Sequence, residues 1–413
     1  MNFALSPEQT MWRDRARAFA RSEAAPIAIA AEAEGRFAIE LVARMGELGL
    51  LAGPVPRDLG GSALDYVSFA LIYEELGYVD SSLRGFLAVH GGLVTACLRD
   101  HGTPEQQRSW IPRLATGEVI GCYALTEPEA GSDAAALRTT ARREGGDYLI
   151  SGTKIWITNG GVADLALVFA RDPALPTEPK HRQICAFLVP TNVQGLIREP
   201  MPGRELGHRG ADHVVLRFDD VRVPASAMLG EAGRGFRVAM GALDHGRLGV
   251  AAGAVGTGRA CVDLAVDFAR ERQAFGQRIG DFGQIQAALA DMSADMDAAT
   301  LLTRHAAWTK DQGLPSTRAT STAKLFATEA ALRAADQAVL LHGGRGYSSA
   351  YAVERHWRDL KGLQIYEGTS HIQRLVIARD LLGPQHDAPA APPGGSPSSS
   401  AAQTTSPSRA ESA

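Results

Sequence analysis

The residue best suited to proton-transfer chemistry is Glu367, in the segment Ile365-Tyr366-Glu367-Gly368-Thr369-Ser370. This segment places a carboxylate between apolar residues and the predicted start of a helix. Shelter from Ile365 and Tyr366 would desolvate the carboxylate and raise its pKa, as a general base requires. A solvated loop glutamate explains the same residues equally well, so the segment alone leaves both interpretations open.

Two further segments could hold a flat or polar ligand. Residues 123–133 are rich in turn formers and follow a predicted strand, so their backbone amides and hydroxyls could reach a polar ligand. In the segment 154–160, Trp156 and Thr158 lie on one face of a strand, where an indole could cover a ring beside a hydroxyl. Taken alone, the first segment is equally a surface loop, and core packing is the favoured interpretation of Trp156.

Other motifs, present or absent, exclude several classes of reaction and ligand. Residues 270–276 end a predicted helix with two cations, which indicates pairing with the helix dipole or, less readily, an anion site. The glycines of residues 253–258 have dinucleotide-loop spacing, but no strand precedes them, so they predict close helix packing. The sequence has no P-loop, G-x-S-x-G or H-E-x-x-H spacing and its histidines are scattered, which argues against phosphoryl transfer, esterase and zinc chemistry and predicts no metal site.

Three predicted units must position these residues, and together they indicate an α+β fold. Residues 1–120 have helical periodicity, with capped helix starts predicted at Ser6-Pro7-Glu8-Gln9, Asp65 and Thr103-Pro104-Glu105-Gln106. Residues 121–229 predict a small antiparallel sheet or barrel, with β-favouring runs at 148–150, 154–158, 165–169, 185–189 and 214–218. Residues 230–383 predict a four-helix bundle and a last helix, in segments near 235–272, 282–312, 317–342, 350–361 and 369–382. Residues 384–413 are rich in Ala, Pro, Ser and Gly and predict a disordered tail.

Composition excludes several classes of partner. The 413 residues carry 42 Lys and Arg against 46 Asp and Glu, so there is no basic excess for nucleic acid. The four cysteines are far apart, which suits reduced thiols in a cytoplasmic protein better than disulfides or a zinc ribbon. No secretory signal and no membrane span of about 18 apolar residues is predicted.

In their order and separation these segments resemble the motifs of the acyl-CoA dehydrogenase family, over about Leu5 to Leu382. Residues 123–133 are similar to its Y/F-x-L-T-E-P-x-A-G-S-D signature, and residues 156–158 to its W-I-T. The remaining matches are Arg272-x-x-Phe275-Gly276 for R-x-x-F-G, Gly343-Gly344-Arg345-Gly346-Tyr347 for G-G-x-G-Y/F, and Tyr366-Glu367-Gly368-Thr369 with Ile372-Gln373 for Y-E-G-T-x-x-I-Q. The resemblance implies the family's fold: a helical domain, a β domain and a helical bundle.

The resemblance also implies non-covalent FAD and a homotetramer. Within one subunit the residues around FAD would be Tyr123, Leu125, Thr126, Ser132, Trp156, Ile157, Thr158 and Thr369. A neighbouring subunit would supply Arg272, Phe275, Gly343 and Gly344, and Gln284 would also contact FAD. Leu340 and Gly283 stand where many members of the family have Gln, with Gln284 beside the second.

The reaction that the resemblance implies is α,β-dehydrogenation of an acyl thioester. Glu367 would take the α-proton while the β-hydride passes to flavin N5, giving a 2-enoyl thioester; the backbone N–H of Glu367 and a ribityl hydroxyl would stabilise the enolate oxygen. Some members carry the base at the position of Gly246, which has no carboxylate here. Further residues implied near the substrate are Ser132, Asp244, Arg247, Tyr366 and Gly368, although Asp244 and Arg247 would equally suit a helix-surface ion pair.

Arg84 is the residue that gives the most information about which acyl group is the substrate. It stands where glutaryl-CoA dehydrogenases have an Arg for the distal carboxylate, and a guanidinium in an acyl pocket would select an acidic or polar chain. An Arg whose head reaches solvent is the ordinary alternative. Gly77 replaces a Glu of the glutaryl enzymes, which argues against decarboxylation. Similar S-S-L-R segments occur in relatives that act on short polar acyl groups bound to an acyl carrier protein in polyketide extender-unit synthesis, which is the alternative substrate class.

Three functional hypotheses follow. The first is a dehydrogenase that passes electrons to an electron-transfer flavoprotein. The second keeps the fold but passes electrons to oxygen. The third is a catalytically idle helical scaffold, which the sheltered Glu367 argues against.

Overall fold

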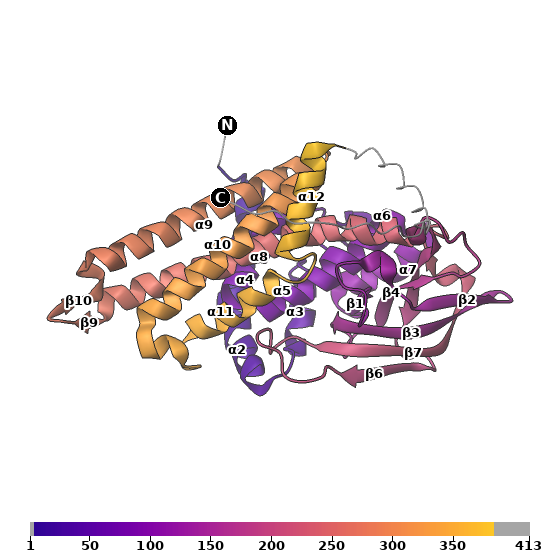
Figure 1. Ribbon diagram of the computed structural model, residues 1–413, viewed down its shortest axis with the longest axis horizontal. Coiled ribbons are helices and arrows are strands. Elements are labelled where there is room, and N and C mark those ends of the chain that lie inside the picture. The colour runs from indigo at the N-terminus through magenta and orange to yellow at the C-terminus, as the bar shows by residue number, and fades with distance from the viewer. Residues whose placement is uncertain (1–3, 384–413) are drawn as a thin grey trace, which may run out of the picture.

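Capped helices form the N-terminal part of the computed structural model, which describes residues 4–383 (Figure 1). The predicted capping boxes are present at Ser6 and Thr103, and Asp65 accepts a hydrogen bond from the Ser68 N–H. These caps satisfy N–H groups that a first helical turn leaves free. The helices are α1 (Pro7–Ala18), α2 (Ala25–Glu34), α3 (Val42–Glu47), α4 (Tyr66–Val79), α5 (Ser81–Leu87), α6 (Ala96–His101) and α7 (Pro104–Thr116), with π-helical segments at Phe19–Ala24 and Ala88–Thr95.

A mixed sheet follows, in the order β6-β7-β3-β2-β4-β5-β8, with β1 paired to β4. Most neighbouring strands are antiparallel, as predicted, but β4 pairs in parallel with both β1 and β2. The apolar strands β4 and β5 are buried over six of their seven residues, because other elements cover both of their faces. The strands are β1 (Gly121–Ala124), β2 (Thr140–Glu144), β3 (Asp147–Thr158), β4 (Leu165–Arg171), β5 (Ile184–Pro190), β6 (Leu196–Pro200), β7 (His213–Pro224) and β8 (Met228–Leu229).

The C-terminal part is a bundle of long helices. Its elements are α8 (Gly235–Glu271), the hairpin of β9 (Gln273–Ala274) and β10 (Gln277–Arg278), α9 (Gly283–Asp311), α10 (Thr317–His342), α11 (Ala352–Leu363) and α12 (Ser370–Leu382). The glycine run 253–258 lies inside α8, and a Cβ on Gly256 would lie 1.9 Å from the Glu74 carbonyl oxygen. Its prediction as a helix-packing segment is therefore confirmed. The predicted tail, residues 384–413, lies outside the described residues.

Helix α8 runs through the core of the protein. Among residues 4–383 it alone is long and apolar enough to cross a membrane by length and composition, but 72% of its apolar window is buried inside the protein. Its contacts with α4, α9 and α10 account for that burial. The observed burial is that of a core helix.

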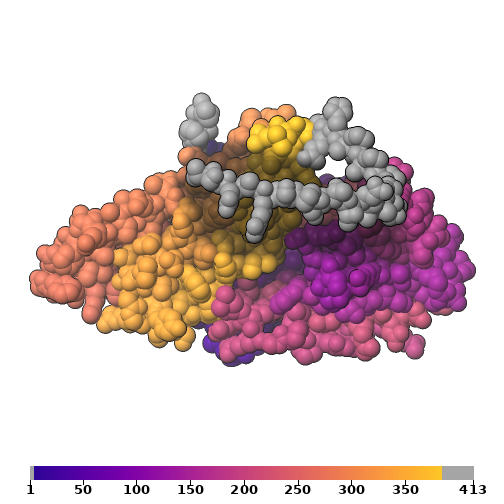
Figure 2. Space-filling model, viewed as in Figure 1, coloured from indigo at the N-terminus to yellow at the C-terminus, as the bar shows by residue number. Residues whose placement is uncertain are grey.

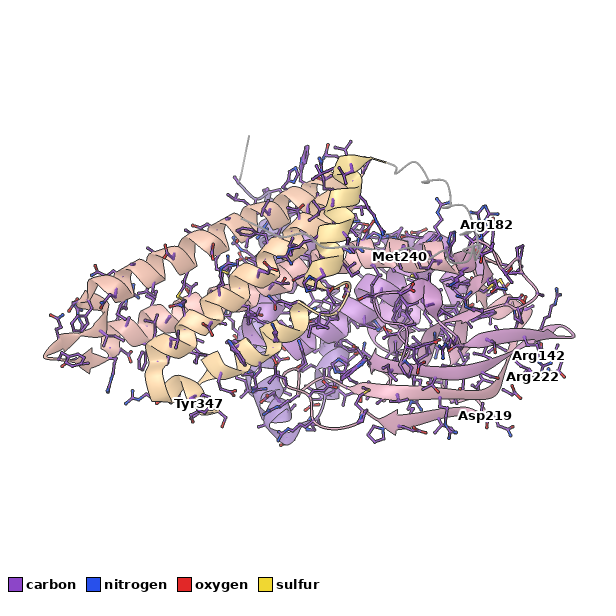
Figure 3. All side chains as sticks on the ribbon, viewed as in Figure 1. Arg142, Arg182, Asp219, Arg222, Met240 and Tyr347 are labelled. Atoms are coloured by element: carbon purple, nitrogen blue, oxygen red, sulfur yellow. The ribbon has the colours of Figure 1, made fainter. Side chains whose placement is uncertain are left out.

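The two ends of the molecule carry different elements. Figure 1 shows the sheet at one end of the long axis and the β9–β10 hairpin at the other, with the turn between α11 and α12 in the middle. In the space-filling view the bundle and the sheet meet along that middle region (Figure 2). Figure 3 places Tyr347, from the turn between α10 and α11, on the bundle side and Arg142 and Arg222 at the far end of the sheet. Residues from the middle can therefore meet in one chain, whereas residues from the two ends cannot.

Candidate active site

The central feature of the site is the strained turn that carries Glu367. Helix α11 ends at Leu363, and the Thr369 side chain caps α12 by accepting the Ile372 N–H at 3.3 Å. Between them Glu367 and Gly368 both have left-handed backbone, with φ of 56° and 93°. Glycine adopts this conformation freely, whereas a residue with a Cβ is strained by about 1 kcal/mol. Strain of this kind persists only where the surroundings hold the residue in place.

One oxygen of the Glu367 carboxylate, Oε2, is held out of water against α8 near the π-helical segment Ala88–Thr95, while the residue as a whole is half-buried. This oxygen has no hydrogen-bond partner within residues 4–383. A Cβ built on Gly246 would lie only 1.8 Å from this oxygen and 3.1 Å from Leu93 Cδ2. Gly246 therefore leaves the space that the carboxylate occupies, and a larger residue there would collide with it.

The prediction that Ile365 shelters the Glu367 carboxylate is wrong. Ile365 is 58% exposed and does not cover the carboxylate. Burial among the groups just described raises the pKa of Glu367 to about 7, and the nearby cations of Arg84, Lys324 and Arg247 limit the rise. A carboxyl with this pKa is partly ionised near neutral pH and is a stronger base than an exposed glutamate.

Arg84 lies fully buried beside the same turn. Its Nη2 donates to the Tyr366 hydroxyl, and its guanidinium carbon lies 5.7 Å from the centre of the Tyr366 ring. Its Nε and Nη1 are buried without a partner in the described part of the chain. The alternative in which Arg84 reaches solvent is therefore wrong. The stem of Arg84 passes over Gly253, which in turn packs against Gly77, so α4 and α8 leave no room there for an acidic side chain.

Asp244 and Arg247 form an ion pair on α8. Arg247 Nη1 donates to Asp244 Oδ1 at 2.6 Å, and Thr317 Oγ1 donates to the other carboxylate oxygen at 2.6 Å. Arg247 is buried rather than on the helix surface, and its Nε has no partner among residues 4–383. The pair thus holds a cation close enough to Glu367 to lower the pKa of that carboxyl.

A buried ion pair on the sheet side fixes the loop after β1. Lys154 Nζ donates to the Leu125 carbonyl at 3.0 Å and to Glu127 Oε1 at 2.7 Å, and the Ile155 N–H donates to the Thr126 carbonyl at 2.9 Å. Glu127 also accepts the Thr139 N–H at 2.9 Å. Sequence reasoning quoted Lys154 and Glu127 within the motifs but gave them no role. The position of Lys154, a charged residue that points inward from an apolar strand, could have indicated a buried ion pair.

Trp156 occupies an irregular point in β3. The pairing of β3 with β7 shifts register between Lys154 and Ile157, and the Trp156 backbone there is left-handed, with φ of 58°. Such an irregularity redirects a side chain, and the indole is 51% exposed while the side chains of Lys154 and Ile157 are buried. The core-packing alternative for Trp156 is therefore wrong. Thr158, at the end of the strand, is partly exposed.

The other predicted cofactor residues of this region differ in what they can offer a ligand. The side chains of Leu125 and Ile157 lie in the hydrophobic core, so only their backbone atoms can contact a ligand. The Tyr123 ring is also buried, and its hydroxyl donates to the Ala239 carbonyl at 3.3 Å. Ser132 is exposed, and Thr126 is half-buried.

The remaining predicted residues lie at the bundle end of the chain. Phe275 is 96% exposed with a left-handed backbone, φ of 53°. It belongs to the β9–β10 hairpin, far from the sheet in Figure 1. The neighbouring candidates at this end are Arg272, Gln284, Gly343 and Gly344. One chain therefore does not bring these residues together with Trp156.

Comparison with known proteins covers nearly the whole described chain. Residues 6–118, 122–221 and 233–382 match the family models of the acyl-CoA dehydrogenase N-terminal, middle and C-terminal domains. The chain is 43% identical over 367 residues to the mitochondrial short-chain specific acyl-CoA dehydrogenase of Homo sapiens, covering 89% of this chain and 88% of that one.

Two solved structures are similar over their full length. Butyryl-CoA dehydrogenase from Megasphaera elsdenii has a TM-score of 0.89 and 35% identity, covering 93% of this chain and 100% of that one. A glutaryl-CoA dehydrogenase from Mycobacterium smegmatis, in complex with FADH2, has a TM-score of 0.87 and 32% identity, covering 93% and 97%.

The raised pKa of Glu367 predicts a pH-dependent stability cost. The folded-state pKa of about 7 exceeds the ordinary 4.5, so ionising this group opposes folding. The cost is absent below pH 4.5, grows between 4.5 and 7, and is constant above 7. We expect Glu367→Gln to raise the free energy of unfolding by about 3 kcal/mol at pH 8 and by nearly nothing at pH 4.5.

Urea unfolding of both proteins at matched flavin content, from pH 4.5 to pH 8, measures this difference. Glu105→Gln is the control, because Glu105 is exposed in the first turn of α7. If the increase in the free energy of unfolding of Glu367→Gln does not change with pH, the Glu367 carboxyl is not desolvated.

Proposed function

This chain belongs to the acyl-CoA dehydrogenase family and is an FAD-dependent acyl-CoA dehydrogenase, and we propose that Glu367 is the base of its reaction. The observation that carries the proposal is the buried, unpartnered Oε2 of Glu367 within the described chain. The carboxylate would take the α-proton of the acyl thioester. A water-excluded site keeps such a base strong and protects the enolate that forms.

The Glu367 backbone supports the same proposal. Its N–H has no acceptor among residues 4–383, although its carbonyl and that of Gly368 are both hydrogen-bonded. A free N–H next to the base is well placed to donate to the thioester oxygen as negative charge develops there. Stabilisation of that charge lowers the barrier to losing an α-proton.

The sheet side of the site fits FAD. Trp156 presents an exposed indole on strained backbone, and Thr158 and Ser132 present accessible hydroxyls, which suits a flat ring with polar edges. We propose that these residues hold FAD together with Thr126, Thr369 and the backbones of Tyr123, Leu125 and Ile157. FAD, when bound, accepts the hydride from the β-carbon.

Arg84 supports a substrate with an acidic or polar acyl group. A guanidinium has five N–H donors, and the one side-chain partner of Arg84 within the described chain is the Tyr366 hydroxyl. A buried cation without a carboxylate partner is costly, and a substrate carboxylate would supply the missing charge. Tyr366, Gly368, Asp244 and Arg247 are proposed to line the same side of the pocket. The absence of an acid at Gly77 supports dehydrogenation without decarboxylation.

The proposal also covers the thiol that carries the acyl group, the electron acceptor and the cellular location. The family's substrate is an acyl-CoA, and a short polar acyl group on a carrier protein is the second candidate because Arg84 would suit either. We propose an electron-transfer flavoprotein as acceptor; rapid reoxidation in air with formation of hydrogen peroxide would contradict it. The four free, buried cysteines suit the reducing cytoplasm, which we propose as the location.

Replacing the base tests the central proposal. We expect Glu367→Gln to keep FAD, because Glu367 is not among the residues proposed to hold it, but to reduce the rate of flavin bleaching by an acyl thioester at least about 100-fold. The native rate should rise with pH through about 7, where the carboxyl ionises. Anaerobic stopped-flow absorbance measures both, with Glu105→Gln as the control. Near-native bleaching in Glu367→Gln would exclude Glu367 as the base.

Substrate preference tests Arg84. We expect Arg84→Met to lower kcat/KM about 10- to 100-fold on acyl thioesters with a distal carboxylate, because a charge-assisted hydrogen bond is lost. At a pH well above 7, where Glu367 is ionised with or without the Arg84 charge, alkyl thioesters of the same length should change little, and Arg84→Lys should retain part of the preference. A panel of CoA-linked and carrier-linked thioesters, scored by flavin bleaching, makes the comparison. An equal loss on every acyl group would make Arg84 structural.

Assembly tests the proposed contribution of a second chain. We propose a homotetramer in which a neighbour supplies Arg272, Phe275, Gln284, Gly343 and Gly344 to FAD. We expect light scattering to give the mass of four chains, and Phe275→Ser to retain less FAD than Ile29→Ser, whose exposed side chain lies on α2. A monomer that binds FAD fully would contradict this arrangement.

A further inference from the structure

Lys324 is a buried cation to which the reaction assigns no role. Residues 4–383 contain two lysines with almost no exposed surface, Lys154 and Lys324. Lys154 is neutralised by the carboxylate of Glu127 at 2.7 Å. Lys324, on α10, forms no ion pair of contact length within the described chain. A buried ammonium group without a contacting carboxylate is destabilising, so its presence needs a reason.

The direct contact of Lys324 is with the turn that carries the base. Its Nζ donates to the Gly368 carbonyl at 2.5 Å. Gln373, fully buried on α12, donates through Nε2 to the same carbonyl at 2.8 Å and to the Glu367 carbonyl at 3.2 Å. Two consecutive carbonyls are thus held by side chains from two different helices. Carbonyl groups buried in a turn need such partners, because the turn has no regular hydrogen-bond ladder.

These contacts act on strained backbone. Glu367 and Gly368 are both left-handed, and the strain at Glu367 favours release into an ordinary conformation. Holding the carbonyls at residues 367 and 368 restricts rotation of the two peptide planes that follow the Glu367 Cα. The direction of the Glu367 side chain therefore depends on the two donors.

The charge of Lys324 acts on the same residue. The charged groups that face Glu367 are Arg84 from α5, Arg247 from α8 and Lys324 from α10, and each lowers the pKa of the carboxyl against the effect of burial. The neighbouring hydroxyls of Tyr73 and Tyr366 remain neutral because burial raises the pKa of each. Burial lowers the pKa of Lys324 itself to about 7, and the Glu367 carboxylate opposes this change.

We propose that Lys324 is a positioning residue for the base: with Gln373 it clamps the turn that aims Glu367, and its charge favours the ionised carboxylate. The inference rests on the proposed role of Glu367. Lys324 touches neither substrate nor reacting atoms in this proposal, so it acts only through Glu367. It predicts two separable effects, one from the hydrogen bond and one from the charge.

Two substitutions separate these effects in the FAD-loaded enzyme. Lys324→Gln removes the charge but keeps an N–H donor, whereas Lys324→Met removes both. We expect both variants to shift the midpoint of the pH–rate profile for flavin bleaching upward by about half a unit, because Lys324 is itself only partly charged near pH 7 and the charge that it contributes there is lost. We expect Lys324→Met also to lower the limiting rate at high pH about 10-fold or more, with KM nearly unchanged, and Lys324→Gln to retain most of that rate.

A non-oxidisable probe provides a second readout. A 3-thia-acyl-CoA can lose its α-proton to the base but has sulfur at the β-position and cannot give up a hydride. The long-wavelength absorbance of its complex, titrated against pH, should move in the same direction as the rate profile. Lys361→Met is the matched control, because Lys361 is exposed on α11 and its Nζ donates to Gln364 Oε1 at 3.0 Å.

The outcomes are distinguishable from failure of the proposed function. Native-like bleaching in Glu367→Gln overturns the role of Glu367 itself. With Glu367→Gln inactive, an unshifted midpoint and a native limiting rate in Lys324→Met overturn the positioning role of Lys324. If Lys324→Met does not fold, Lys324→Gln decides, since an unshifted midpoint in that variant also overturns the proposal.

Discussion

The site depends on one desolvated carboxyl group held against a helix that lacks a side chain at the point of contact. Gly246 leaves the space in which Glu367 Oε2 lies, and α8, a core helix, fixes the position of that glycine. Burial without a hydrogen-bond partner in residues 4–383 makes the carboxyl a stronger base than an exposed glutamate. The close packing of α8 with α4, possible because Gly77, Gly253 and Gly256 carry no side chains, keeps this arrangement rigid.

Desolvation alone would leave the carboxyl protonated, and the surrounding cations set the balance. Arg84, Arg247 and Lys324 come from three different helices and all favour the ionised form. They are arranged differently: Arg247 is paired with Asp244, Lys324 holds the turn, and Arg84 keeps buried donors without a partner in the described chain. A carboxyl group that is buried among cations can have a raised pKa, which makes its carboxylate a stronger base, and still be partly ionised near neutral pH. Arg84, as the least satisfied of the three, is also the group with most capacity to bind part of a substrate.

The sheet and the bundle make separate contributions. The Lys154–Glu127 pair fixes the loop after β1, and the irregular pairing of β3 turns Trp156 outward. Phe275 is more exposed than Trp156 and has a similarly left-handed backbone, but its hairpin lies at the opposite end of the molecule from the sheet. Exposed aromatic residues on strained backbone indicate function more than stability, because each costs energy that folding alone would avoid. The strand that carries Trp156 and the hairpin that carries Phe275 therefore lie too far apart to meet within one chain.

Local sequence determined the elements and most of the candidate residues, while tertiary contacts decided their environments. The caps at Ser6, Asp65 and Thr103 and the long helices were predictable, because capping and helical periodicity depend on residues a few positions apart. The family motifs identified Glu367 by resemblance. The outward turn of Trp156, the burial of Arg84 and the exposure of Ile365 were not predictable locally, because register shifts and helix packing join residues far apart in the chain. The contact between Gly246 and Glu367, which lie near opposite ends of the C-terminal part of the sequence, exists only once α8 and the α11–α12 turn have packed together.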